Sequence, residues 1–319
     1  MKGKLYMGLD VGGSRISAAL VDTKGEMYQL HRQRTPETGE ETRAVIIEFA
    51  RELLDRAANG SAQIMGIGIG FGGPVDYRNQ RVRRSHHKRG WEVNFPLAQT
   101  VGEELGLPVR IDNDANTACL GEAMFGAGRG KERVLYINVG TGIGGALVRN
   151  FQIYHGAHSN AGEIGHMILK KDGPECACGH HGCLEALASG TAMGVAGREV
   201  VRAGKAKGSA LLQTPVDDID GALVGELAVA GDEVCIDIVA EAADWLALAA
   251  ANACNLWDPD AVIIGGGVSD IGETLMKPMR ESFRRYAVPP LNEETDLFIA
   301  RLGYDAGVIG AAALALTTL

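Results

Sequence analysis

The sequence predicts an α/β protein made of two similar lobes with a cleft between them. Short apolar runs that end in glycine-rich turns alternate with longer amphipathic segments, as strands and helices do in this class. Two stretches also echo each other: L-Y-M-G-L-D-V-G-G near the N-terminus and L-Y-I-N-V-G-T-G from Leu135. Each reads as a buried strand, a glycine-rich turn and a second strand, so we infer a duplicated architecture.

Size and charge narrow the class of protein. The 319 residues suffice for two ordinary domains with a sizeable core. The net charge of −9, from 31 basic and 40 acidic residues, disfavours nonspecific binding to nucleic acid or anionic membranes. The N-terminal stretch has too few apolar residues for a signal peptide, and no apolar run reaches the length of a membrane helix. We therefore expect a cytoplasmic protein without nucleic-acid or membrane partners.

In the first half of the chain, strands are expected where apolar runs stop at turns, and helices where apolar residues recur at helical spacing. The expected strands span residues 5–10, 15–22, 64–71 and 109–111, and the expected helices span 40–58, 97–105 and 117–125. The glycines at 12–14 read as a hairpin between the first two strands. Residues 78–89 read as a charged loop that carries His86, His87 and Arg89.

The second half continues the alternation. Strands are expected at residues 134–139, 146–148, 258–264 and 297–301, and helices at 190–203, 224–230, 233–256, 272–285 and 308–316. Three cysteines, Cys119, Cys235 and Cys254, fall in apolar helical contexts, so we expect them to be buried free thiols.

A different group of cysteines points to a structural zinc site. Its members are Cys176, Cys178 and Cys183, with His166 ten residues before the first of them. Three thiolates and an imidazole are a common ligand set for tetrahedral zinc, and Cys176 and Cys178 are too close for a relaxed disulfide. His180 and His181 lie inside the cysteine segment, and spacing alone does not choose the histidine ligand. Glu163 and Glu185 flank this segment, so a bound metal would also fix those carboxylates.

Glycine-rich turns suggest a phosphate site of an unusual kind. Two G-x-G-x-x-G matches begin at Gly68 and Gly140, but neither leads from a strand into a helix, which excludes a dinucleotide fold, and no P-loop sequence is present. The two glycine hairpins at 12–14 and 140–142 could instead offer backbone N–H groups to phosphate, although each alone could be a tight turn. Asp10 could then hold Mg²⁺ through water.

The D-N-D stretch after the strand at 109–111 carries the candidate catalytic group. Phosphoryl transfer to an alcohol needs a carboxylate that orients the hydroxyl and accepts its proton. Asp114 is our candidate base, and Asn113 could bind sugar hydroxyls. The structural alternative is an Asx turn or an N-cap for the helix at 117–125, and it applies first to Asp112.

In their order along the chain, these motifs resemble the ROK family of repressors, open reading frames and kinases. The motifs are G-L-D-V-G-G-S, F-G-G-P-V-D, D-N-D-A-N, G-T-G-I-G-G, A-G-E-I-G-H, C-A-C-G-H-H-G-C-L-E and I-I-G-G-G. The resemblance covers nearly the whole chain. It implies an actin-like ATPase (ribonuclease H-like) duplicated fold. The N-terminal lobe would comprise residues 1–118 with 305–319, and the larger lobe, residues 119–304, would carry the zinc site.

The resemblance also implies roles for individual residues in an ATP-dependent, Mg²⁺-dependent sugar kinase, with glucokinase as the leading possibility. Asp114 matches the catalytic base. The matches to sugar-binding residues are Gly73, Asn113, Asp114, Glu163, His166 and Glu185. The nucleotide-binding matches are Asp10, Gly12, Gly13, Ser14, Gly140, Thr141, Gly142, Gly265, Gly266 and Gly267. His166 with the three cysteines matches the zinc set. Closure of the lobes over sugar and ATP, and homodimers or tetramers, are further family properties.

Three departures from the family pattern leave the substrate open. Ser14 replaces a threonine, Gly72 stands where proline is common, and the residues before Gly90 read S-H-H-K-R. That last loop helps to read sugar substituents, so the sequence does not choose the hexose or the hydroxyl. The main alternative is a sugar-sensing repressor, which would need a DNA-binding domain ahead of the first strand. The other is a non-catalytic sugar-binding protein, which the intact Asp10 and Asp114 argue against.

Overall fold

The computed structural model describes residues 3–60, 62–83 and 90–319, so His86, His87 and Arg89 lie outside the described residues. The chain divides into two compact units. Unit 1 comprises Met1–Glu132, Ala146–Gly162 and Arg301–Leu319, and unit 2 comprises Arg133–Gly145 and Glu163–Ala300. Within the described ranges, no helix is both long enough and apolar enough to span a membrane.

A five-stranded sheet in the order β3-β2-β1-β4-β7 forms the centre of unit 1. Its strands are β1 (Gly3–Val11), β2 (Arg15–Asp22), β3 (Met27–Arg34), β4 (Ala62–Phe71) and β7 (Val109–Asn113). β1, β2 and β3 form an antiparallel meander, whereas β4 runs parallel to β1 and β7 runs parallel to β4. The carboxyl ends of β1, β4 and β7 therefore meet at one edge of the sheet, which is where α/β proteins place their sites.

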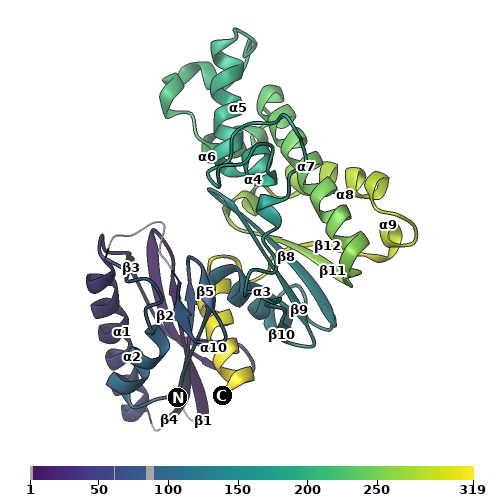
Figure 1. The fold of residues 1–319 in the computed structure, drawn as a ribbon. Coiled ribbons are helices and arrows are strands. Elements are labelled where there is room, and N and C mark those ends of the chain that lie inside the picture. The colour runs from purple at the N-terminus through teal and green to yellow at the C-terminus, as the bar shows by residue number, and fades with distance from the viewer. Residues whose placement is uncertain (1–2, 61, 84–89) are drawn as a thin grey trace. The chain divides into compact units, whose positions relative to one another are not determined.

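Helices cover both faces of this sheet (Figure 1). They are α1 (Gly39–Asn59) and α2 (Leu97–Leu105) on one face, and α3 (Asp114–Phe125) and α10 (Ala306–Thr318) on the other. Met7 and Leu9 of β1 share a buried cluster with Ile46 of α1 and Leu97 of α2. On the opposite face, a side chain at Gly68 would overlap the carbonyl oxygen of Ala311, so this glycine lets α10 lie directly on the sheet.

The second sheet repeats the strand order of the first, β10-β9-β8-β11-β12. Its strands are β8 (Arg133–Val139), β9 (Ile143–Arg149), β10 (Gln152–Ile153), β11 (Ala261–Gly265) and β12 (Asp296–Ile299). β11 runs parallel to both β8 and β12, while β10 is antiparallel to β9. The repeated order confirms the α/β class and the duplication inferred from the echoed motifs.

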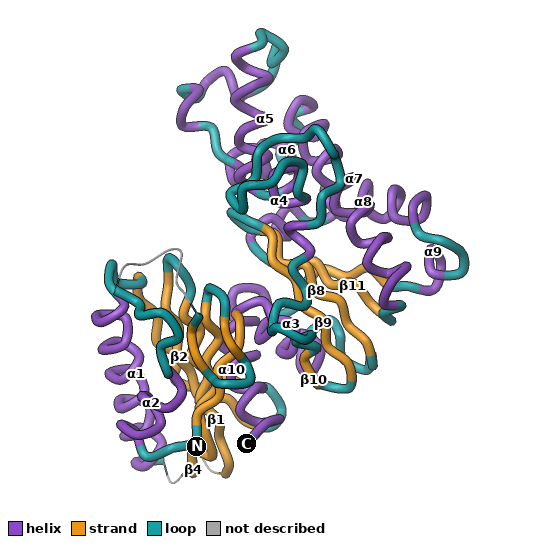
Figure 2. Tube along the Cα trace, in the orientation of Figure 1, coloured by secondary structure: helices purple, strands orange, loops and turns teal. Residues whose placement is uncertain are grey.

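Unit 2 is rich in helices, which pack on one another as well as on the sheet (Figure 2). They are α4 (Leu184–Ala188), α5 (Gly190–Arg202), α6 (Gly221–Val229), α7 (Glu233–Trp257), α8 (Glu273–Tyr286) and α9 (Leu291–Glu294). Buried Cys235 and Cys254 belong to α7, and buried Cys119 belongs to α3, as expected for free thiols.

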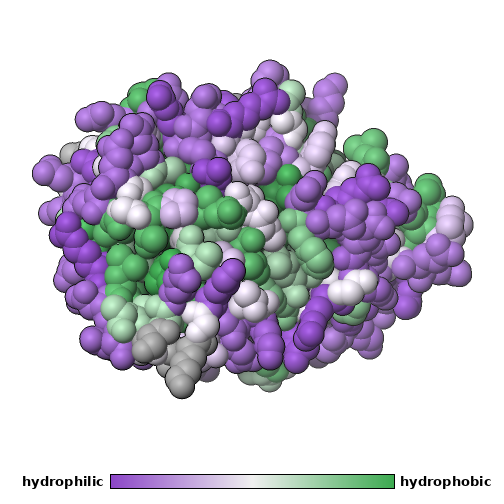
Figure 3. All heavy atoms as spheres, turned by 90° about the horizontal axis from the view of Figure 1, so that it is seen from below, coloured by the Kyte–Doolittle hydropathy of each residue, from purple (hydrophilic) through white to green (hydrophobic). Residues whose placement is uncertain are grey.

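Figure 3 shows apolar side chains toward the middle of the face that it draws, with hydrophilic ones around them.

Several local expectations are wrong, each for a physical reason. β3 was not expected because it is an edge strand whose side chains are mostly exposed and polar. The segment at 78–89, expected to be a charged loop, contains the short strand β6 (Arg81–Val82), which pairs with β5 (Val75–Asp76). β11 begins at residue 261 rather than 258, because Asp258 has left-handed backbone at the end of α7, with φ of 50°.

The D-N-D stretch also differs from its expected structure. β7 extends to Asn113, and α3 begins at Asp114 rather than at residue 117. The N-cap of α3 is Asn113 and not Asp112. A strand that runs straight into a helix leaves room for a single capping residue, and Asn113 occupies that position.

Candidate functional site

The turn between β7 and α3 in unit 1 has a fixed geometry. The side-chain oxygen of Asn113 accepts the N–H groups of Ala115, at 2.9 Å, and Asn116, at 3.4 Å. The side-chain nitrogen of Asn113 donates to the carbonyl oxygen of Gly73 at 3.3 Å. Asp114 is the first helical residue, and its carboxylate also accepts the N–H of Ala115, at 2.9 Å. These bonds hold Asn113 and Asp114 at the carboxyl end of β7.

The ends of β1 and β4 lie beside this turn. A β-carbon at Gly72 would stand 3.4 Å from Oδ2 of Asp114 and 3.4 Å from the α-carbon of Gly12, so glycine allows these segments to approach. The glycine hairpin itself is closed by a 2.9 Å bond from the N–H of Gly12 to the carbonyl oxygen of Arg15. Unit 1 thus brings together the candidate residues Asp10, Gly12, Gly73, Asn113 and Asp114, and Ser14 lies on the exposed side of the hairpin.

Asp10 is electrostatically unusual. Burial of its carboxyl and, to a smaller extent, the nearby Asp114 carboxylate raise its pKa to about 7, against the opposing effect of Arg32 and Arg15. A β-carbon at Gly307, in the first turn of α10, would lie 2.7 Å from this carboxyl. Two acidic groups in an enclosed position repel each other, and a hydrated divalent cation would relieve that repulsion. The residues present therefore suit Mg²⁺.

In unit 2, four side chains form a cluster with the dimensions of a zinc site. The cluster consists of His166, Cys176, Cys178 and Cys183, whose ligand atoms all lie within 4.8 Å of one another. The sulfurs of Cys178 and Cys183 are 3.7 Å apart. Sulfurs at about 2.3 Å from a tetrahedral zinc ion stand about 3.8 Å apart, so the donor set and its spacing both fit zinc.

The surrounding backbone and the lowered pKa of one thiol fit the same interpretation. The backbone N–H of Cys176 donates to the carbonyl oxygen of His180 at 2.8 Å, which folds the cysteine segment back on itself. Hydrogen bonds from the backbone and side chain of His180 lower the pKa of Cys178 to about 6, whereas burial raises the pKa of Cys183 to about 12. His180 lies 3.5 Å from Cys178 but is outside the four-residue cluster, as is His181, which contacts the carbonyl oxygen of Gly173.

Glu185 links the cysteine cluster to the glycine turn at 140–142 within unit 2. It lies in α4, two residues after Cys183, and its Oε2 accepts the N–H of Ile143 at 2.8 Å. Its Oε1 lies 3.7 Å from the sulfur of Cys176. A side chain at Gly142 would overlap this carboxylate. The bond to Ile143 could not be inferred from the sequence, because its partners are 42 residues apart.

The other candidate residues of unit 2 have different surroundings. Glu163 is exposed before the 3₁₀ turn Ile164–His166. Thr191, which sequence reasoning missed, donates its hydroxyl hydrogen to the carbonyl oxygen of Thr141 at 2.7 Å and so fixes the second glycine turn. Gly265 and Gly266 have a packing role, because side chains there would overlap Tyr136 and the carbonyl oxygen of Val139. A β-carbon at Gly267, by contrast, would have no neighbour within 4 Å.

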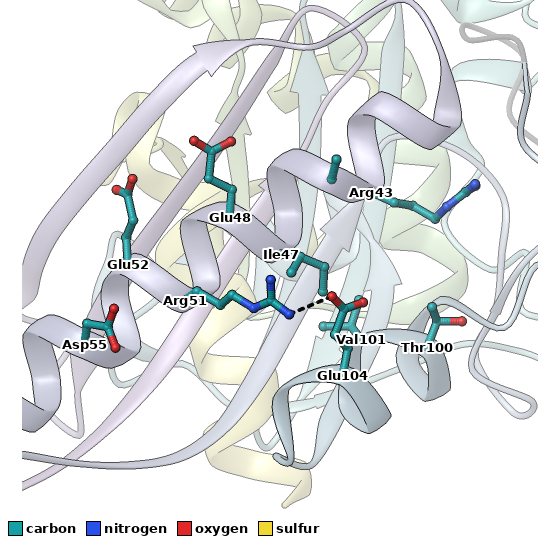
Figure 4. A pocket seen from close by; sticks show the side chains of 10 residues that line it. Arg43, Ile47, Glu48, Arg51, Glu52, Asp55, Thr100, Val101 and Glu104 are labelled. Carbon is teal, nitrogen blue, oxygen red and sulfur yellow. Dashed lines mark hydrogen bonds and ion pairs between the residues drawn. The ribbon is translucent and has the colours of Figure 1, made fainter.

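A groove between α1 and α2 lies apart from these residues (Figure 4). It has a volume of about 510 Å³ and is crossed by the 2.9 Å ion pair of Arg51 with Glu104. Its walls carry charged side chains of both signs, including Arg43, Glu48 and Glu52. Its lining includes none of the residues that the sequence singled out, so it adds nothing to the candidate site.

Comparisons with known proteins agree with the motif order. The model of the ROK family matches residues 6–318. A glucokinase from Halalkalibacterium halodurans is 37% identical, over 97% of this chain and 94% of its own length. A xylose repressor from Caldicellulosiruptor bescii is 28% identical, over 98% of this chain and 78% of its own length.

A solved structure extends the agreement to the fold. It is a ROK family glucokinase from Streptomyces griseus in complex with glucose and AMPPNP, 35% identical to this chain. It superposes with a TM-score of 0.83, over 98% of this chain and 99% of its own. The repeated strand order is therefore that of the actin-like ATPase fold. With its motifs in the family's order and the family model matched along almost its entire length, the chain belongs to the ROK family.

Proposed function

We propose that this protein transfers the terminal phosphoryl group of ATP to a hydroxyl of a hexose or N-acetylhexosamine. One observation carries the proposal: the Asp114 carboxylate lies at the carboxyl end of β7, beside Gly12 of the first glycine hairpin. A general base next to a phosphate-binding turn is the arrangement that phosphoryl transfer to an alcohol requires. The similarity to the glucokinases makes glucose the first substrate to test.

The proposed reaction uses the residues of unit 1 as follows. Asp114 accepts a hydrogen bond from the reacting sugar hydroxyl and takes its proton as the oxygen attacks the phosphorus atom. Asn113 and Gly73, which are already joined to each other, bind neighbouring hydroxyls. Gly12, Gly13 and Ser14 form the first phosphate-binding turn: the N–H of Gly12 closes it on Arg15, and the N–H groups of Gly13 and Ser14 would bind phosphate oxygens. Mg²⁺, held by Asp10 through water, would neutralise charge on the transferring group.

In unit 2, we propose that the candidate residues bind the rest of the two substrates. Gly140, Thr141 and Gly142 would bind phosphate, and Gly265, Gly266 and Gly267 would border the adenosine. Glu163, His166 and Glu185 would bind sugar hydroxyls, with zinc on the cysteines and His166 holding these carboxylates in place. The bond of Glu185 to Ile143 supports this proposal, because it gives a zinc-braced carboxylate a defined position beside the glycine turn.

The direct test is coupled ADP release over a panel of glucose, N-acetylglucosamine, N-acetylmannosamine, fructose and allose. We expect Mg²⁺-dependent turnover on at least one sugar, with glucose favoured. Absence of turnover on every sugar would contradict the proposal. The similarity to a xylose repressor makes retention of operator-like DNA the companion measurement, and sugar-dependent retention without turnover would favour the repressor alternative.

Asp10→Asn tests the proposed magnesium ligand, with opposite effects expected on activity and stability. We expect kcat to fall on the order of 10²-fold, since a bound cation supplies several kcal/mol of charge stabilisation. The sugar KM should not change. Asp55→Asn, on the exposed side of α1, is the control.

The stability effect of the same variant follows from the raised pKa of Asp10, about 7 against an ordinary 3.8. The folded protein favours the protonated carboxyl, so ionised Asp10 destabilises it fully above pH 7 and not at all below about pH 4. Asp10→Asn should therefore raise the Tm of the Mg²⁺-free protein at pH 8, with a smaller gain at pH 5. A lowered Tm at pH 8 together with unchanged kcat would contradict this role.

We also propose a homo-oligomer, a dimer or tetramer, in the cytoplasm. Exposed apolar side chains on unit 2, such as Leu256, Val229 and Leu212, support association between copies.

A further inference from the structure

A buried hydrogen bond between an aspartate and a histidine lies at the base of the turn that carries the proposed catalytic base. Asp112 is buried, and its Oδ2 is 2.6 Å from Nε2 of His155. The side chain of His155 is 16% exposed, so most of the ring is also removed from water. A buried carboxylate requires such a partner, and a short charge-assisted hydrogen bond is among the stronger polar interactions in proteins. None of the roles assigned above uses either residue.

The other oxygen of Asp112 holds the turn that contains Asp114. Oδ1 accepts the side-chain N–H of Asn116 at 2.7 Å and the backbone N–H of Asn113 at 2.8 Å. The Asp112 carboxylate is therefore bonded to the residues on both sides of Asp114 through one oxygen, and to His155 through the other. The imidazole ring is therefore connected through Asp112 to the residues on either side of Asp114.

His155 is itself fixed by the hairpin of β5 and β6. The ring of Tyr77 stacks on the imidazole, with centroids 3.7 Å apart and planes inclined by 10°. Gln80 anchors that hairpin to β7, accepting the N–H of Ile111 at 2.8 Å. The hairpin also holds the chain after His155, because Arg83 donates to the carbonyl oxygen of His158 at 2.9 Å.

We propose that His155 is a positioning residue for sugar phosphorylation, acting on Asn113 and Asp114 through Asp112. The inference rests on the proposed function. His155 also begins the short segment that leads to Glu163, so the pair anchors both the base and the chain that precedes a proposed sugar ligand. Displacement of reacting groups by about 1 Å costs up to about 10²-fold in rate, so loss of this support should affect the sugar and not the nucleotide.

The test compares His155→Leu with His155→Arg in the whole enzyme. Leucine removes the hydrogen bond to Asp112, and we expect sugar kcat/KM to fall about 10²-fold, through both a lower kcat and a higher sugar KM. The ATP KM should change less than about twofold. Arginine supplies a planar hydrogen-bond donor that can stack on Tyr77 and bond Asp112, so His155→Arg should recover most of the loss. His158→Leu makes the same change at an exposed position of the same loop and is the control.

A purely structural role would lower the fraction of active enzyme, and hence kcat, without moving either KM. Unchanged sugar KM in His155→Leu, or equal losses in the leucine and arginine variants, would overturn the inference. If His155→Leu does not fold, the double variant Asp112→Asn/His155→Leu also removes the Asp112 carboxylate that the leucine would leave buried without its histidine. This double variant should show the same selective rise in sugar KM. The unmodified protein separates failure of this inference from failure of the proposed function. If the unmodified protein turns over no sugar, both the proposed function and the role of His155 are overturned.

Discussion

Replacement of Asp114 by asparagine is expected to lower kcat for sugar phosphorylation by about 10²- to 10⁴-fold, the usual contribution of a positioned general base. An amide cannot accept the hydroxyl proton at neutral pH. It can still accept the N–H of Ala115 that the carboxylate accepts now, so the start of α3 should keep its geometry. We therefore expect a sugar KM within about threefold of the original, since only an interaction made in the transition state is lost.

Coupled ADP release gives kcat for this variant, and calorimetric titration with sugar shows whether binding survives. Asp55→Asn makes the same change on the exposed side of α1 and should leave both quantities unaltered. The Asp114 carboxylate also raises the pKa of Asp10. Its removal should therefore lower that pKa, which carbon-13 NMR of the Asp10 carboxyl can measure. Full activity in Asp114→Asn would disprove the base assignment.

The sequence predicted the elements whose burial it encodes directly. Strands β1, β2 and β4 lie in the core, and their apolar runs mark them clearly. Apolar residues at helical spacing predicted the helices α2 and α7. β3 has no such mark, because an edge strand is held by backbone hydrogen bonds that any side chain permits. The strand order itself was not predicted; one repeated motif predicted only that the architecture is duplicated.

The candidate site shows the same division between local and distant information. The four members of the cysteine cluster span 18 residues; motif spacing was enough to propose the three cysteines, and the resemblance to the ROK family chose His166 among the histidines. The partner of Asp112 is His155, 43 residues further along the chain, and nothing in either neighbourhood joins them. Asp112 was read as a helix cap because an aspartate before a helix usually serves as one. Asp112 is buried, which only the fold reveals, and its carboxylate is hydrogen-bonded to His155 instead.

Removal of the proposed zinc ion should have the second large effect, and Cys178→Ser is the sharpest way to remove it. Cys178 is exposed, so its replacement leaves no cavity, and any loss can be attributed to the metal. Structural zinc contributes about 10–16 kcal/mol to the folding of small zinc domains, so we expect the zinc content to fall from about one per chain to near zero and the Tm to drop. Cys254→Ser alters a buried thiol in α7, outside the cluster, and should retain the metal.

The consequence for sugar binding follows from the position of Glu185. Cys183 directly precedes α4, and Glu185 lies in its first turn, so release of the cysteine frees the helix that carries the carboxylate. The Glu185 carboxylate then keeps its bond from Ile143 but loses the support of metal-bound cysteines, and we expect sugar affinity to fall about 10-fold or more, as when supporting contacts of a ligand are lost. Metal analysis, thermal melting and sugar titration on the same preparation separate the possible results. Zinc loss with unchanged sugar affinity would show that the metal supports the fold without orienting Glu185, whereas retained zinc in Cys178→Ser would contradict the ligand set itself.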